Sequence, residues 1–245
     1  NTIIKNRKVF RAFYSTNLMN ESVQNNSTVN QGDFIEIKFT GFVDGKAFDS
    51  NILEDLKKLN PKAEPEKTIL IVGRDMVVRG LDSALVGKEF GQEYKINLSC
   101  KDAFGQRYKE LIRTIPLKIF TQQKIAPRLG ASFILDNQLA KVIAISGARV
   151  ITDFNNPLAG KDIEYKFIPV RIISDLKEKA EAVCKLILRF VPKIEIENNT
   201  VTINGPKILE NILKHSEPEF KSLLNVQVNF KEEAKEEPEE KEINS

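Results

Sequence analysis

The segment LIVGRDMVVRGLDSALVGKEFG, residues 70–91, decides how the rest of the chain is interpreted. It begins with a short apolar run, residues 70–72, that is typical of a buried strand. Apolar residues at helical spacing follow, namely Leu81, Leu85 and Val86. Glycines bracket the predicted helix. Because the segment contains no phosphate-binding loop or metal-ligand cluster, we expect any chemistry here to come from shape and apolar surface.

The whole chain has the composition of a soluble globular protein, with 41% hydrophobic and 29% charged residues. Its 245 residues suffice for one large domain or two to three small ones. Residues 1–20 carry four basic side chains and no acidic one, but no stacking platform accompanies them, so we expect no nucleic-acid partner. No apolar run approaches the ~20 residues that span a bilayer. We therefore expect no membrane partner and a cytoplasmic protein.

Cysteine and histidine are too scarce to suggest a metal centre. Cys100 and Cys184 lie in apolar surroundings without CxxC spacing, so we expect buried packing residues instead of a disulfide or metal ligands. His215 is the single histidine, and we expect it on the surface at a helix end. A single histidine makes a histidine zinc site or a Ser-His-Asp triad improbable. We therefore expect no metal and no cofactor.

The N-terminal residues 1–31 are expected to form a basic and polar extension without fixed structure. Residues 1–18 could instead be an amphipathic targeting segment, although the apolar core of a secretory signal is missing. Met19 could also be the true start of translation. The sequence leaves these alternatives open.

From Gly32 onward the pattern changes to strands. Residues 34–39 alternate as a half-buried strand does, and Asp44-Gly45 forms the turn into a second strand at 46–49. A charged loop with a short helix follows at 52–67. The alternating residues 93–98 predict a further strand after the central helix.

These segments resemble the FKBP-type prolyl isomerases. The resemblance rests on GDFIEIKFTGFVDGKAFDSN (32–51) followed by VGRDMVVRGLDSALVGKEFGQ (72–92), and on the later DAFG (102–105) and NPLAGKDIEYKF (156–167). It implies an α+β fold, in which an FKBP-like antiparallel sheet formed by residues 32–105 and 157–174 wraps on a short helix.

Residues 106–156 interrupt this domain and are similar to the flap insert of the SlyD-like subgroup. Turn residues separate three predicted strands, at 132–135, 139–145 and 148–154, so a small β-rich domain is expected. The resemblance implies that the insert binds unfolded chains; alternatively, its apolar residues pack on each other or on the C-terminal part. The expected client-binding residues are Ile134, Leu135, Val142, Ile143, Ile145 and Val150.

Residues 175–230 predict a further domain of αββαβ order. Asp175 with Glu178 forms a capping box ahead of an amphipathic helix. A hairpin at 193–203, a second helix from Pro206 through Leu213 and a strand at 226–230 follow. The unit resembles the extra domain of long archaeal SlyD-like FKBPs, and it could form a homodimer. The tail 231–245 holds seven Glu and three Lys, so we expect it to be disordered.

The activity implied by the resemblance is rotation about X-Pro peptide bonds, in which no covalent bond is made or broken. Position by position, the resemblance assigns catalysis to Asp49, Phe104 and Tyr165. It assigns substrate binding to Phe39, Phe48, Val77, Val78 and Leu81. We expect Asp49 to organise the pocket or to polarise the twisted amide without transferring a proton. Taken singly, each apolar member is more often plain core, but the set in the family's order, with Asp49 among its members, favours the site.

Three positions depart from the family pattern. Phe39 and Phe104 stand where the family usually has tyrosine, and Leu81 stands where its drug-binding members have tryptophan. The hydroxyl missing at Phe104 would be worth ~0.5 to 1.5 kcal/mol as a hydrogen-bond donor. Arg79 is expected on the surface, and Asp82 is expected as a charge favoured by the helix start.

The sequence therefore predicts a peptidyl-prolyl cis-trans isomerase whose insert binds unfolded or Pro-containing polypeptides. One alternative is a non-catalytic holdase chaperone with a degenerate isomerase pocket. Another is an interaction module in which the C-terminal domain does the work and the isomerase fold is a scaffold.

Overall fold

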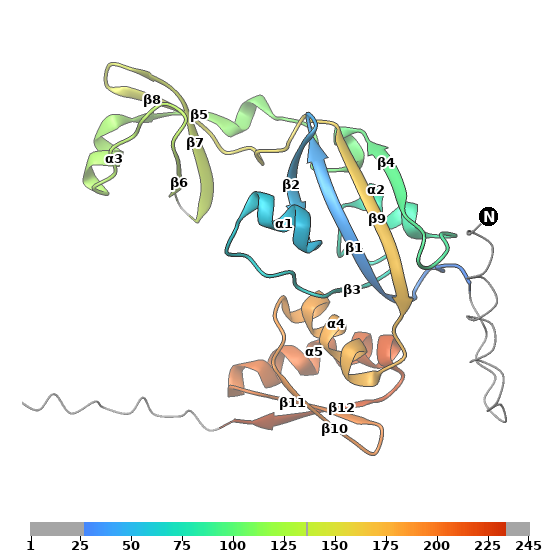
Figure 1. Cartoon of the computed structure of the whole chain (residues 1–245). Coiled ribbons are helices and arrows are strands. Elements are labelled where there is room, and N and C mark those ends of the chain that lie inside the picture. The colour runs from blue at the N-terminus through green and yellow to red at the C-terminus, as the bar shows by residue number, and fades with distance from the viewer. Residues whose placement is uncertain (1–26, 136, 234–245) are drawn as a thin grey trace, which may run out of the picture.

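A computed structural model describes residues 27–135 and 137–233, so the interpretations of residues 1–26 and of the end of the tail, 234–245, lie outside the described residues. The main unit is a five-stranded antiparallel sheet in the order β2-β1-β9-β4, with β3 also paired to β1 (Figure 1). Its strands are β1 (Phe34–Val43), β2 (Lys46–Ser50), β3 (Thr68–Ile71), β4 (Tyr94–Leu98) and β9 (Ile163–Ile172). The α+β fold predicted from the sequence is confirmed.

Helix α2 (Arg79–Leu85) packs on this sheet through the fully buried Leu81 and Leu85. Arg79 is exposed as expected. Asp82 lies in the first turn but is buried, and its carboxylate accepts hydrogen bonds from the Gly73 and Asp75 backbone N–H groups, at 2.8 and 2.9 Å. Asp82 therefore fixes the loop that precedes the helix, a role beyond the expected helix-start charge.

The folded part begins before Gly32, earlier than the predicted end of the N-terminal extension. Val29 is fully buried, and its N–H and C=O groups bond to the Lys88 carbonyl and the Gly87 N–H, each at 2.8 Å. Thr28 forms an isolated bridge with Glu89. This segment thus belongs to the same core as the central sheet. A short helix, α1 (Leu53–Leu59), packs beside β2 in the predicted loop.

The insert forms its own four-stranded antiparallel sheet, in the order β5-β8-β7-β6. It follows two short 3₁₀ helices, η1 (Cys100–Asp102) and η2 (Lys109–Leu111). Its elements are β5 (Ile112–Pro116), α3 (Leu117–Gln122), β6 (Ser132–Leu135), β7 (Gln138–Ser146) and β8 (Arg149–Asp153). The three predicted strands are present, whereas β5 and α3 were not predicted.

The C-terminal unit has the predicted αββαβ order. It consists of α4 (Leu176–Leu188), β10 (Lys193–Glu197), β11 (Thr200–Gly205), α5 (Lys207–Leu224) and β12 (Gln227–Glu232). Strand β11 pairs antiparallel with β10 and parallel with β12. Because β12 continues to Glu232, the expected disordered tail is wrong for residues 231 and 232, which pair with the end of β11. The Asp175 side chain accepts the Glu178 N–H at 2.9 Å, which confirms the N-cap half of the predicted capping box, whereas the Glu178 carboxylate pairs with Lys67 and Arg171.

Helix α5 corrects two expectations, since it continues past Leu213 to Leu224 with Pro218 inside it. Phe220 and Leu224 extend the buried stripe of Leu213, so packing on the core outweighs the local cost of the proline. His215 is exposed as expected, but it lies within the helix and not at its end.

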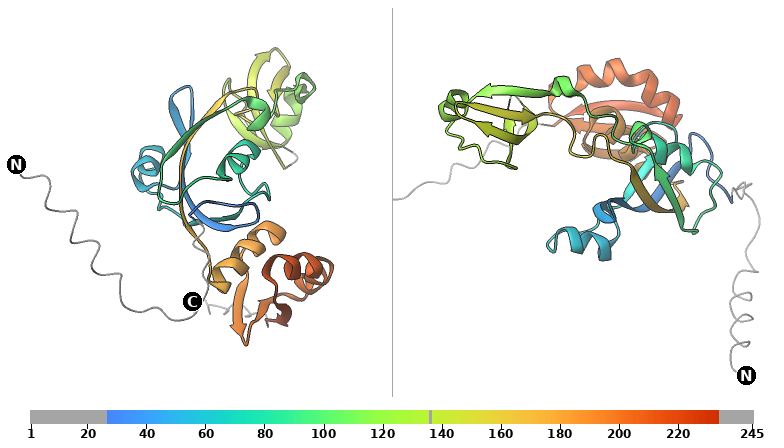
Figure 2. Two further views of the ribbon diagram at one scale, coloured as in Figure 1. Left: turned by 90° about the vertical axis from the view of Figure 1, so that its right-hand side faces the viewer. Right: turned by 90° about the horizontal axis from the view of Figure 1, so that it is seen from above.

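The C-terminal unit shares one hydrophobic core with the end of the central sheet, where Phe34, Ile71 and Ile173 pack with α4 and α5. Glu178 of α4 forms ion pairs with Lys67 and Arg171 across this junction. The insert lies at the opposite end of the sheet (Figure 2).

The two cysteines are free thiols. Cys184 is buried in the core of the C-terminal unit as expected, whereas Cys100 at the start of η1 is only half-buried. Within 27–135 and 137–233, no helix combines the length and apolar character needed to cross a membrane.

Candidate active site

Three residues from three strands lie side by side at the insert end of the central sheet. Gly41 of β1 pairs with Asp49 of β2 on one side and with Tyr165 of β9 on the other. The pairing forms a cross-strand row, Asp49–Gly41–Tyr165. Asp49 and Tyr165, which are far apart in the sequence, therefore lie on either side of Gly41.

Four aromatic rings, those of Phe39, Phe48, Phe104 and Tyr165, cluster beside this row, and we call this cluster the aromatic cup. Edge-to-face contacts join Tyr165 to Phe39 and to Phe48, with ring centroids 6.1 and 6.0 Å apart. Phe48 contacts Phe104 in the same way at 5.7 Å. Such pairs add stability beyond area burial, so the rings hold one another in place.

The other predicted apolar residues complete the same cluster. Leu81 is fully buried and Tyr165 is only 4% exposed, while Val77 and Val78 are half-buried in the loop before α2. The structure therefore brings together all seven aromatic and aliphatic residues that the sequence assigned to the site. The eighth, Asp49, joins them through the cross-strand row.

Gly41 was not predicted as a site residue, and the structure explains why it must be glycine. A Cβ atom at this position would lie 2.6 Å from Cζ of Phe48 and 2.9 Å from Cε1 of Tyr165. The two rings thus occupy the space that any other side chain would need. A glycine inside an otherwise alternating strand is the sequence feature that could have revealed this close approach.

Asn51, directly after β2, is a second residue that sequence reasoning missed. Its Oδ1 accepts the Phe39 N–H at 2.8 Å, and its Nδ2 donates to the Ile37 carbonyl at 2.8 Å and to Thr68 Oγ1 at 2.9 Å. Ser50 Oγ donates to the Phe39 carbonyl at 3.1 Å. These bonds fix the backbone of Phe39, and with it the position of one wall of the cup.

The electrostatics of the site follow from its apolar walls. Asp49 is exposed to solvent by surface area, but the apolar residues around its carboxyl partly desolvate it and raise its pKa, although a hydrogen bond from the Ser50 backbone N–H opposes the rise. Burial, together with the nearby Asp49 carboxylate, raises the pKa of Tyr165 to about 12. The Tyr165 hydroxyl therefore stays protonated at neutral pH and can donate a hydrogen bond.

The expected client-binding residues of the insert divide between its surface and its core. Ile134 and Ile145 are exposed, and Ile143 is half-buried. The prediction is wrong for the other three, which are buried in the insert: Leu135, Val142 and Val150.

Two of these residues are buried because the insert has a core of its own. Val142 and Val150 form this core with Phe120, and Phe133 packs against them. Leu139, which was not predicted, is exposed and lies directly opposite Ile134 in the β6–β7 ladder.

The two segments that connect the insert to the sheet are tied together. Asn155 Oδ1 accepts the Tyr108 N–H at 2.8 Å, and its Nδ2 donates to the Tyr108 carbonyl at 2.9 Å. Nearer the sheet, the Gly160 N–H donates to the Gly105 carbonyl at 2.8 Å. Gly105 directly follows Phe104, so the insert is attached beside the aromatic cup.

Comparison with known proteins identifies the family. A family model for FKBP-type peptidyl-prolyl cis-trans isomerase matches residues 25–120, and one for the FKBP26 IF domain matches residues 113–158. Over 141 residues the chain is 30% identical to the short-type peptidyl-prolyl cis-trans isomerase of Methanocaldococcus jannaschii, an alignment that covers 56% of this chain and 89% of that protein.

The SlyD proteins are more distant relatives. The FKBP-type peptidyl-prolyl cis-trans isomerase SlyD of Treponema pallidum is 27% identical over 108 residues, which is 43% of this chain and 61% of the relative. SlyD of Escherichia coli K12 is 24% identical over 110 residues, or 44% of this chain and 56% of the relative. The alignments thus span somewhat over half the length of these two SlyD proteins. With its fold, its aromatic cup and these matches, the chain belongs to the FKBP-type peptidyl-prolyl cis-trans isomerases.

Proposed function

We propose that this isomerase rotates X-Pro bonds of unfolded or partly folded polypeptides in the aromatic cup, and that the insert binds these clients next to it. The observation that supports the first part is the convergence of Asp49, Phe104 and Tyr165 with the apolar residues of the cup. An intact, closely packed cup favours the isomerase over the alternative of a holdase with a degenerate pocket.

The chemistry requires only that the amide lose resonance. Rotation has an uncatalysed barrier of roughly 18 to 20 kcal/mol, and the cis and trans ground states differ by only about 1 kcal/mol. Water stabilises the charge-separated planar amide. When the proline ring is bound among Phe39, Phe48 and Leu81, the X-Pro amide would lose part of that stabilisation and twist more easily. Asp49 would act through its field on the twisting amide, without proton transfer.

Tyr165 would provide the hydroxyl that the other rings lack. Phe39 and Phe104 carry none, so Tyr165 is the one phenol among the four rings of the cup. Its pKa of about 12 keeps it protonated. We propose that it donates a hydrogen bond that orients the bound peptide.

The proposed client surface is the outer face of β6 and β7. Ile134 and Leu139, opposite each other in the ladder, are 69% and 52% exposed. Strand β6 is also an edge strand, so its outer backbone groups can pair with an extended segment of another chain. Apolar side chains beside an open edge suit a segment that has not yet buried its own apolar residues.

Two assays separate the two parts of the proposal. The double variant Ile134→Ser/Leu139→Ser should lose suppression of client aggregation and slow the refolding of a proline-limited protein, while keeping the wild-type rate on a short X-Pro peptide. The matched control is Leu129→Ser, which changes an equally exposed apolar residue of the insert outside its strands. Unchanged chaperone activity in the double variant would remove the insert from client binding.

We further propose that the C-terminal unit mediates homodimer formation. Ile208 and Ile212 lie one turn apart on α5 and are 72% and 45% exposed. Sedimentation of the full chain should show a dimer that Ile208→Asp converts to a monomer. A monomeric wild type at all concentrations tested would exclude dimerisation through this face.

A further inference from the structure

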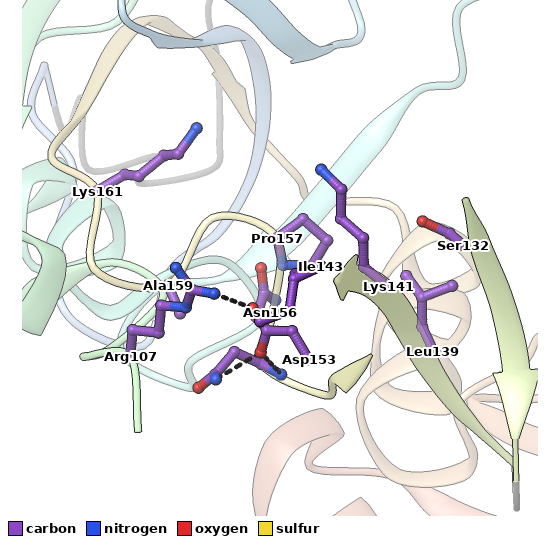
Figure 3. Close-up of a pocket in the computed structure, with 11 residues that line it drawn as sticks. Arg107, Ser132, Leu139, Lys141, Ile143, Asp153, Asn156, Pro157, Ala159 and Lys161 are labelled. Carbon is purple, nitrogen blue, oxygen red and sulfur yellow. Dashed lines mark hydrogen bonds and ion pairs between the residues drawn. The ribbon is translucent and has the colours of Figure 1, made fainter. Parts of the chain in front are cut away.

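A cavity of about 310 Å³ opens where the insert meets the segment that returns to the central sheet (Figure 3). It lies between the insert sheet and residues 155–161. Its wall combines basic and apolar side chains, chiefly those of Arg107, Leu139, Lys141, Ile143, Pro157 and Lys161.

The charges around the cavity are unbalanced toward positive. Its single carboxylate, Asp153, is 12% exposed and forms an ion pair with Arg107. Burial disfavours the Asp153 charge, but hydrogen bonds from the Asn155 side chain and backbone and from Arg107 lower its pKa overall. The Asp153 carboxylate is therefore bound to Arg107 and Asn155 and does not neutralise the two lysines of the cavity wall.

Two lysines remain to act on a ligand. Lys141 forms no ion pair with any residue of the described part of the chain, and Lys161 lies 3.8 Å from the highly exposed carboxylate of Asp44. Their amino groups come from opposite walls and lie toward the same side of the cavity (Figure 3). A weak, water-exposed pair such as Lys161–Asp44 offers little competition to a bound anion.

The apolar part of the cavity joins the proposed client surface. Leu139 and Ile143 reach the cavity from β7, and Leu139 is also the cross-strand partner of Ile134. A segment lying along the exposed face of β6 and β7 would therefore pass from apolar contacts directly to the two lysines. We propose that this cavity is a subsite for an acidic side chain, Asp or Glu, that follows an apolar residue in an extended client segment.

This subsite would add specificity to the isomerase reaction, and it rests on the proposed client binding by the insert. Arg107 follows Phe104 by three residues and Lys161 precedes Tyr165 by four, so both cavity walls lead directly into the aromatic cup. A client held at the subsite by its carboxylate would be kept close to the cup, which raises the effective concentration of its nearby prolines.

The test uses the full chain and a fluorescein-labelled unstructured peptide with an apolar stretch followed by one Glu. The same peptide with Gln at that position is the matched neutral probe. Fluorescence anisotropy should give a Kd for the Glu peptide about threefold to tenfold lower than for the Gln peptide, as expected for two partly exposed ion pairs. The difference should shrink as salt is added.

Variants locate the effect. Lys141→Gln/Lys161→Gln should abolish the preference for Glu and leave the Kd of the Gln peptide unchanged. Lys118→Gln, which changes an exposed lysine of α3 outside the cavity, should keep the preference.

Equal affinity for the two peptides in the wild type, or a preference that survives the double variant, would overturn the subsite. In either case, binding of the Gln peptide that depends on Ile134 and Leu139 would leave client binding by the insert intact. Binding of neither peptide would overturn both.

Discussion

Asp49 and Tyr165 lie on either side of Gly41 in one cross-strand row, and the carboxylate of Asp49 contributes to raising the pKa of Tyr165 to about 12. An acid with a raised pKa and a phenol that resists ionisation thus flank Gly41 beside the apolar residues of the cup. Neither group is suited to covalent chemistry in this arrangement. Both can act on the dipole of a twisting amide.

Asp49→Asn should lower activity and raise stability. Removal of the charge should reduce kcat/KM on an X-Pro peptide about tenfold, or about 1.4 kcal/mol of transition-state stabilisation. Because partial desolvation raises the folded-state pKa of Asp49, its contribution to stability is complete below the ordinary pKa of 3.8 and is lost as pH rises through the folded pKa. Because solvent screens this exposed carboxylate, the variant should have a Tm only slightly above that of the wild type at pH 7 and an equal Tm at lower pH. A lower Tm at neutral pH would contradict the raised pKa of Asp49 in the folded protein.

Tyr165→Phe keeps the ring contacts with Phe39 and Phe48 and removes only the hydroxyl. We expect kcat/KM to fall severalfold. The unfolded chain ionises tyrosine near pH 10, whereas Tyr165 in the folded protein ionises near 12, so wild-type stability should fall across that interval more steeply than that of the variant. Denaturant unfolding of both proteins between pH 9 and 12, where other groups titrate alike, measures the difference. Parallel stability curves would mean that Tyr165 is accessible to water.

Gly41→Ala should damage the cup more than any other single-methyl change there. The new Cβ would come within 3 Å of the rings of Phe48 and Tyr165, so the rings or strand β1 must move, at a cost of typically 1 to 3 kcal/mol. Gly45→Ala is the comparison variant: nothing lies within 4 Å of its new atom, but a φ of +73° strains any L side chain there, so it reports the cost of backbone strain without a clash with the rings. Near-UV circular dichroism and peptide turnover should change in the first variant and much less in the second.

Phe104→Tyr should increase activity, because it restores the hydroxyl that the family usually has at this position. A gain of about twofold to tenfold in kcat/KM corresponds to one hydrogen bond of ~0.5 to 1.5 kcal/mol. Phe39→Tyr is the companion variant on the neighbouring wall. If neither raises kcat/KM, the hydroxyl of Tyr165 already supplies what these positions lack.

Much of the site was predictable because its residues lie in the short motifs that carry the family resemblance. Phe39 and Phe48 lie in strands β1 and β2 and Phe104 lies in the turn after η1, and the structure gathers them into one cluster. Gly41 and Asn51 were missed because their roles depend on cross-strand register and on backbone groups of other segments. The glycine in an alternating strand hints at a close approach at Gly41, but no local pattern identifies the partners of either residue.

The insert and the ends of elements were less predictable for a different reason. Residues 142–145 form an unbroken apolar run, and a bulge between Val142 and Ala144 changes which of them face the core. Val29 lies in a polar segment, and its burial depends on contact with residues 87–88. Pro218 suggests a helix end, but the buried Phe220 overrides it. In each case tertiary packing decides what local pattern leaves open.

The most direct test is the rate of cis-to-trans isomerisation of a short X-Pro peptide with increasing amounts of the full chain. We predict a rate that rises in proportion to enzyme concentration and that falls by at least tenfold in Phe48→Ala, which removes the ring contacting both Phe104 and Tyr165. A circular dichroism spectrum like that of the wild type would confirm that the variant is folded. A wild-type rate equal to the uncatalysed rate at every concentration, or equal rates for wild type and Phe48→Ala, would contradict the assignment of catalysis to the aromatic cup.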